Sequence, residues 1–174
     1  RMYFTDRQRG AVLRLSRDGL TPISNVGMKS WFRENLKMCD ILVGTFDAVN
    51  GEYNLTLDYK PSFLTDSEEI YDTLETNAEG EQLKPFDRTI SFNEGSKGWV
   101  SFKDFKPQAG GSVSGKYITA RDGNIWKHYA TSGLDDAGEL TDIKYGQFYG
   151  SEYEATFTAV FNDMPGTIKH FQTI

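Results

Sequence analysis

Four short runs of β-branched and aromatic residues between Arg88 and Tyr129 constrain the fold of this chain most strongly. The runs are Thr89–Phe92, Trp99–Phe102, Lys116–Ala120 and Asn124–Tyr129. Such residues favour strands because their side chains pack well on a pleated sheet. Glycine-containing segments, among them Arg121–Gly123, lie between neighbouring runs, and glycine adopts the positive φ that a tight hairpin requires. The region therefore predicts an antiparallel meander of four strands.

A single meander has two faces and cannot bury them by itself. It can be one blade of a propeller, or a part of a barrel or sandwich. We therefore expect further strands, and the remaining sequence supplies candidates at Met2–Asp6, Ala11–Ser16, Leu20–Ser24, Ile41–Phe46, Glu52–Leu57, Glu154–Phe161 and Thr167–Ile174. Asn50-Gly51 lies between two of them and is one of the strongest short hairpin signals.

Residues 24–38 break the strand pattern and predict the one helix of the chain. Ser24 or Asn25 is the expected N-cap, and one face carries apolar residues at helical spacing, namely Met28, Trp31, Phe32 and Leu36. Two interpretations stay open for this face. The helix packs on its own domain, or Met28, Trp31 and Phe32 form a candidate subunit interface, because large aromatic side chains anchor many interfaces.

The composition agrees with short strands and many turns. The 174 residues include 12 Phe, 9 Tyr and 3 Trp, together with 17 Gly and 5 Pro. No linker separates two domains, so residues 1–174 are predicted to be a single domain. We expect an all-β fold of antiparallel meanders, a partial propeller with β-propeller-like blades and one inserted short helix. The chain starts and stops inside strand-like segments, so we expect it to be a fragment of a longer chain.

The charge and the cysteine content exclude several classes of function. A net charge of −6 argues against binding nucleic acid by neutralising phosphates. An acidic surface would let DNA pass without sticking, although ordinary solubility explains the same charge. Cys39 is the only cysteine, so the chain has no internal disulfide and no cysteine-based zinc cluster. No apolar run approaches the roughly 18 residues of a membrane span, and no signal peptide is visible.

The sequence offers little that predicts catalysis. Ser101, His128 and Asp104 could form a triad on paper, but no nucleophile-elbow motif supports it. His128 and His170 are expected to be structural. Gly110–Gly115 lacks the Lys-Ser/Thr of a phosphate-binding loop and is expected to be a flexible loop between strands. We predict no enzyme activity and no catalytic, metal-binding or cofactor-binding residues.

One turn is similar to a feature of sugar-cleaving propellers. Residues 119–126 nearly fit the Asp-box turn of sialidases, but Arg121 occupies the position of the defining aspartate. That turn is structural even in those enzymes. The abundant tyrosine and tryptophan residues keep a glycan-binding adhesin as an alternative function, because sugars stack on aromatic rings.

An ordered set of segments resembles a family of large virion proteins of tailed bacteriophages. The segments are RGAVLRLSRDGLTPIS (9–24), GMKSWF (27–32), TFDAVNGEYNLT (45–56), SFNEGSKGWVSF (91–102), DGNIWKH (122–128), FYGS (148–151) and VFNDMP (160–165). The resemblance implies β-propeller domains in the tail, as muzzle, nozzle or baseplate components. It implies a non-enzymatic structural role in a ring-like oligomer, with other copies of the chain and other tail proteins as partners and the virion tail as the location.

Overall fold

The computed structural model describes residues 1–39, 41–58, 88–134, 140–142 and 145–156. Strands dominate this part of the chain, and every pair of strands is antiparallel. The described segments contain one α-helix, α1 (Lys29–Met38), and one short 3-10 helix, η1 (Ile23–Asn25). The all-β prediction with one inserted helix is therefore confirmed. No closed barrel forms among these residues, in agreement with a partial, propeller-like arrangement.

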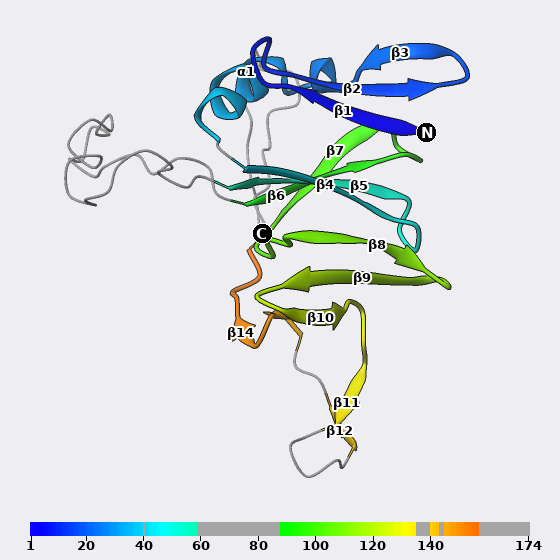
Figure 1. The fold of residues 1–174 in the computed structure, drawn as a ribbon, viewed down its shortest axis with the longest axis vertical. Helices are drawn as coiled ribbons and strands as arrows, with labels where there is room; N and C mark the ends of the chain where they lie inside the picture. The colour runs from blue at the N-terminus through cyan, green and yellow to red at the C-terminus, as the bar shows by residue number, and fades with distance from the viewer. Residues whose placement is uncertain (40, 59–87, 135–139, 143–144, 157–174) are drawn as a thin grey trace, which may run out of the picture.

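Three main sheets are stacked along the long axis of the molecule (Figure 1). The first contains β1 (Met2–Asp6), β2 (Ala11–Ser16) and β3 (Gly19–Pro22). The second contains β4 (Ile41–Asp47), β5 (Glu52–Asp58), β6 (Thr89–Asn93) and β7 (Gly98–Lys103). The third contains β8 (Ala109–Val113), β9 (Lys116–Arg121) and β10 (Asn124–Lys127). Two small hairpins follow, β11 (Ser132–Leu134) with β12 (Leu140–Asp142) and β13 (Gln147–Phe148) with β14 (Ser151–Glu152).

The predicted four-stranded meander between Arg88 and Tyr129 is wrong as a single unit. Its first two strands, β6 and β7, complete the second sheet, whereas β9 and β10 belong to the third. The expected flexible loop at Gly110–Gly115 is also wrong, because most of it is strand β8. A Cβ at Gly110 would lie 2.9 Å from the Ile118 carbonyl oxygen, so glycine permits a close approach of β8 to β9. A glycine-rich strand carries no β-branched signal, which explains the error.

The second sheet has one apolar and one polar face. Opposite residues of paired strands share a face, so Gly44, Leu55 and Ile90 lie on one side and Thr45, Asn54 and Ser91 on the other. The apolar side also carries Tyr53, Leu57, Phe92 and Trp99. The polar side also carries Asp47, Thr56 and Thr89. The second sheet can therefore pack through apolar contacts on one face and through hydrogen bonds on the other.

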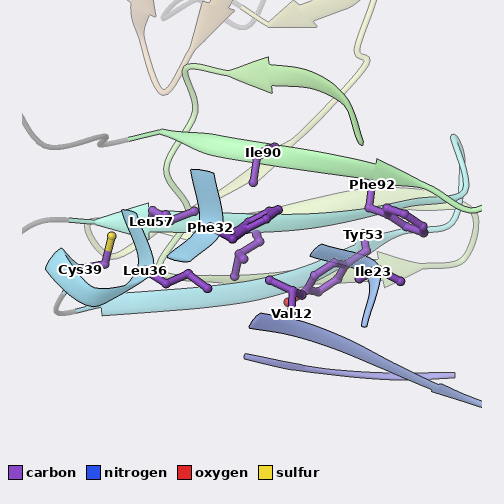
Figure 2. Packing of buried hydrophobic residues seen from close by; sticks show 10 residues of the cluster. Val12, Ile23, Phe32, Leu36, Cys39, Tyr53, Leu57, Ile90 and Phe92 are labelled. Carbon is purple, nitrogen blue, oxygen red and sulfur yellow. The ribbon is translucent and has the colours of Figure 1, made fainter. Parts of the chain in front are cut away.

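The main core lies on the apolar face, which α1, η1 and the first sheet cover (Figure 2). Phe32 and Leu36 of α1 are fully buried there, and Val12 of β2 and Ile23 of η1 join them. Full burial of one such side chain stabilises the fold by about 1.5–3 kcal/mol. The helix is thus held by packing of one apolar stripe.

The helix begins later than its sequence pattern predicts. Ser24 and Asn25 belong to η1, and α1 begins at Lys29 with Met28 at the N-cap position and no side-chain cap. The predicted cap is therefore wrong. Gly27 has a φ of +70°, which interrupts the helical path between the two segments.

Several predicted features lie outside the described residues. They include most of the strand candidate Glu154–Phe161, the whole of Thr167–Ile174, most of the acidic segment 58–84 and His170.

Candidate functional site

A layer of hydrogen bonds joins the polar face of the second sheet to the third sheet. The Tyr117 hydroxyl lies 2.7 Å from Thr45 Oγ1, and Asn54 Nδ2 donates to it over 3.2 Å. The Ser91 hydroxyl donates to Asn54 Oδ1 over 2.6 Å. Burial raises the pKa of Tyr117, although the hydrogen bonds with Thr45 and Asn54 act against it. The phenol therefore stays neutral at ordinary pH and serves as a structural hydrogen-bonding group.

An ion pair between Lys103 and Glu52 adjoins this hydrogen-bonded layer at Asn54. Lys103 Nζ donates to Glu52 Oε2 over 2.5 Å and to Asn54 Oδ1 over 3.3 Å. Both charged side chains are mostly buried. Because the amine is held by a carboxylate and an amide, this lysine supports the packing of the sheets and is not poised as a nucleophile.

Asp47 organises the turn between β4 and β5. It is fully buried, and its Oδ1 accepts hydrogen bonds from the backbone N–H groups of Val49 and Asn50. Its Oδ2 accepts from Asn50 Nδ2 and, over 2.7 Å, from the Tyr129 hydroxyl. The same carboxylate thus shapes the predicted Asn50-Gly51 hairpin and fixes Tyr129 of a distant segment.

His128 is a buried structural residue, as the sequence analysis expected. Its Nε2 lies 2.8 Å from Thr119 Oγ1, and its ring packs against Phe105 and Tyr117 at centroid distances of 4.7 Å. Burial lowers the pKa of His128 to about 4, despite the opposing charge of Asp47. The structure pairs Asp104 with Arg88, so the triad drawn from the sequence is not assembled.

A hollow of about 390 Å³ lies between the end of β10 and the β13–β14 hairpin. We call it the aromatic hollow. Its lining includes the aromatic residues Trp126, His128, Tyr129, Tyr145, Phe148 and Tyr149 and the polar residues Lys127, Thr131 and Gln147. The Trp126 and Tyr149 rings meet edge to face with centroids 5.5 Å apart. The hollow is therefore mostly apolar, with a polar minority, as ligand sites commonly are.

Two tyrosines of the aromatic hollow have a strained backbone. Tyr129 has a φ of 58° and Tyr149 a φ of 54°. Tyr149-Gly150 forms the turn between β13 and β14, where the hairpins at Ser114-Gly115 and Asp122-Gly123 place a small or polar residue. A left-handed conformation in a bulky residue costs on the order of 1–3 kcal/mol. The Tyr149 hydroxyl lies 2.9 Å from Thr119 Oγ1, which helps to hold the ring in place.

The outer face of the first sheet forms a second candidate surface. The register places Met2, Leu15 and Leu20 side by side, and Phe4, Leu13 and Pro22 in the next row. Met2 and Leu20 are 58% and 57% exposed, and Phe4 and Leu15 are 41% and 38% exposed. We call these six residues the apolar sheet face. The opposite face carries Tyr3, which stacks on the second sheet, so the exposed side is a separate surface.

The predicted interface residues on α1 lie mainly against the protein's own core. Phe32 is fully buried, and Trp31 is half-buried with its ring 4.9 Å from Phe32 and 5.7 Å from Phe102. Met28 packs against the same core. Phe32 therefore belongs to the core, as the intradomain alternative states, whereas a role of Met28 and Trp31 at an interface stays a prediction.

Sequence reasoning missed both candidate surfaces. The apolar sheet face follows from the alternation of Met2 and Phe4 only when the register with β2 is known. Residues 145–149 form one side of the aromatic hollow, and the sequence predicted no element or site for them, although their three aromatic residues were an available signal.

The described side chains include no group of three histidine, cysteine, aspartate or glutamate residues placed to hold a metal ion. Within the same ranges, no helix combines the length and the apolar character needed to cross a membrane. No protein-family model matches the chain, and a search of curated proteins finds no relative.

Proposed function

We propose that this chain is a structural, non-enzymatic module of a bacteriophage tail, which packs against other copies of itself through the apolar sheet face. The apolar sheet face carries the proposal. Soluble monomers rarely leave a contiguous apolar surface uncovered unless a partner binds it. Here the partner is a sheet of a neighbouring copy.

The packing inside the molecule supports this mode of assembly. The first sheet already uses its inner face to pack on the second sheet through Tyr3 and Val12. An added sheet on the outer face would continue the same stack. The resemblance of the segments at 9–24, 91–102 and 122–128 to tailed-phage virion proteins supplies the biological setting.

Analytical ultracentrifugation of residues 1–174 tests the assembly step. We expect self-association at micromolar concentration, and Leu20→Ser with Met2→Ser should weaken it by at least 10-fold. Both side chains are more than half exposed, so the fold should tolerate the changes. Val49→Ser is the matched control, because Val49 is 52% exposed but lies on the β4–β5 turn. A monomeric wild-type chain at 100 µM, about the range of weak association, contradicts the proposal.

The phage setting has a test of its own. Peptide mapping of purified tailed-phage particles from the source should recover peptides of this sequence in the tail fraction. Recovery only from infected cells, and never from particles, would remove the virion assignment while leaving the self-association result intact.

A further inference from the structure

The aromatic hollow leaves aromatic side chains exposed to solvent at a site that the stacking of sheets does not require. Tyr145 is 96% exposed and Tyr129 is 52% exposed, while Trp126 and Phe148 are half-buried behind them. The volume of about 390 Å³ is at the lower end of the range for ligand sites, so it suits one ring and not a large ligand. A pyranose ring has a face of C–H groups that packs on aromatic rings and an edge of hydroxyl groups. We propose that the aromatic hollow binds a pyranose unit of a glycan.

Two rings of the hollow, those of Tyr129 and Tyr149, are held by contacts within the protein. The hydroxyl of Tyr129 donates to the buried carboxylate of Asp47, and the hydroxyl of Tyr149 is within hydrogen-bond distance of Thr119. Arg121 also lies over the Tyr149 ring at 5.3 Å. Side chains that become ordered only on binding lose conformational entropy, which weakens affinity. Rings that are already held avoid this loss and therefore bind a flat ligand face more tightly than mobile rings would. The strained φ values of these same two tyrosines are maintained by the surrounding contacts, as at other binding sites.

The polar lining residues match the edge of a sugar. Thr131 and Gln147 are exposed and border the hollow. Together they offer hydroxyl and amide groups, which both donate to and accept from sugar hydroxyls. A purely apolar ligand would form no hydrogen bonds with these groups, so they favour a ligand that carries hydroxyl groups.

Single-stranded nucleic acid is the other ligand class that stacks on aromatic rings. Such binding also needs a positively charged groove that follows the phosphate backbone. The hollow has one basic residue in its lining, Lys127, and the chain as a whole carries a net charge of −6. The charge therefore favours a saccharide.

A glycan array carrying bacterial capsular and lipopolysaccharide glycans, probed with residues 1–174, identifies the bound sugar. Isothermal titration with that glycan then gives the affinity. We expect Tyr145→Ala to weaken binding by at least 10-fold without changing Tm, because the ring is almost fully exposed. Ile125→Ala is the matched control, since Ile125 is 78% exposed and points to the opposite face of β10 from Trp126. It should leave the affinity unchanged.

Two outcomes would overturn the proposal. One is an array on which no glycan binds the wild-type chain more strongly than the Tyr145→Ala variant. The other is binding of an eight-nucleotide oligothymidylate, lost in Tyr145→Ala, with no glycan bound. The proposal does not depend on the phage setting, so its failure leaves the self-association result unaffected.

Discussion

The ring of Tyr3 lies parallel to the ring of Tyr53, with centroids 4.0 Å apart and an interplanar angle of 4°. Tyr3 belongs to β1 and Tyr53 to β5, so this contact helps to join the first sheet to the second. Burial raises the pKa of Tyr53 to about 12, and both phenols stay neutral at ordinary pH. The pair therefore acts by packing and not by charge.

A double-mutant cycle measures this contact. Tyr3→Leu and Tyr53→Leu should each destabilise the fold, and their coupling energy should be about 0.5–1.5 kcal/mol, the range for aromatic pairs. Urea unfolding of the wild type, the two single variants and the double variant supplies the four free energies. Tyr3→Leu combined with Val49→Ala provides an additive control, because Val49 is an exposed turn residue. Full additivity of the tyrosine pair would show that the rings do not interact.

Glu94 forms an ionic link to the first sheet through Arg14 of β2. Arg14 Nε and Nη2 donate to its two carboxylate oxygens over 2.6 and 2.8 Å, and Tyr3 donates to it as well. Glu94→Gln should destabilise the protein by about 2–3 kcal/mol, somewhat less than for a fully buried pair, because Arg14 keeps some contact with water. Asp6→Asn is the control, since its partner Arg9 is largely exposed and a surface pair contributes about 0–1 kcal/mol.

The Glu94 link also predicts a loss of stability in acid. Burial by itself would raise the pKa of Glu94, but the hydrogen bonds from Arg14 and Tyr3 outweigh it, and the pKa lies below the ordinary value. A lowered carboxyl pKa contributes stability above the unfolded-state pKa of about 4.3, and this contribution is lost as the pH falls through the folded-state value. Urea unfolding between pH 5 and 2.5, a range chosen to bracket about 4.3, should show a smaller decline for Glu94→Gln than for the wild type.

His128 predicts a second pH effect in a different range. Burial lowers its pKa to about 4, while in the unfolded chain the pKa is about 6.5. The unfolded state therefore binds a proton first, and stability is complete above pH 6.5 and declines as the pH falls toward 4. We expect a decline of about 2 kcal/mol after allowing for partial contact with solvent. His128→Gln should flatten the curve in this range alone; an unchanged slope would assign the decline to other groups.

Gly10, in the β1–β2 turn, lies close to the backbone of α1. It has a φ of +64°, and a Cβ there would lie 2.3 Å from the Arg33 Cα, so the backbone of the helix would have to move. Gly10→Ala should destabilise the protein by more than about 2 kcal/mol. Gly19→Ala is the matched control, because Gly19 also has a positive φ but open space around it. Equal melting temperatures of the two variants would contradict this account.

The sequence predicted elements well where local pattern and tertiary packing agree. The bounds of β1 and β2 follow from their apolar runs, and the β4–β5 hairpin follows from Asn50-Gly51. Prediction failed where the decisive interaction is distant in the sequence. Strand β8 pairs with β9 where Gly110 fits closely against Ile118 and Thr119, and the start of α1 is set by the positive φ of Gly27. Neither property can be derived from periodicity alone.

The position of the tyrosines in the aromatic hollow also depends on residues that are distant in the sequence. Tyr129 reaches it through a hydrogen bond to Asp47, 82 positions earlier in the chain. Tyr149 occupies a turn position where asparagine or aspartate would be expected. Aromatic residues at such positions have no local stabilising role, so only the folded structure shows what they line.

The contacts on the two faces of the second sheet should respond differently to temperature. Contact between apolar surfaces weakens on cooling, which affects the contact held by Tyr3, Val12 and Phe32. The contact at Tyr117, Thr45 and Asn54 combines hydrogen bonds with burial of the Tyr117 ring, so it depends less on temperature. On cooling, the first sheet should therefore separate from the second sheet before the third sheet does.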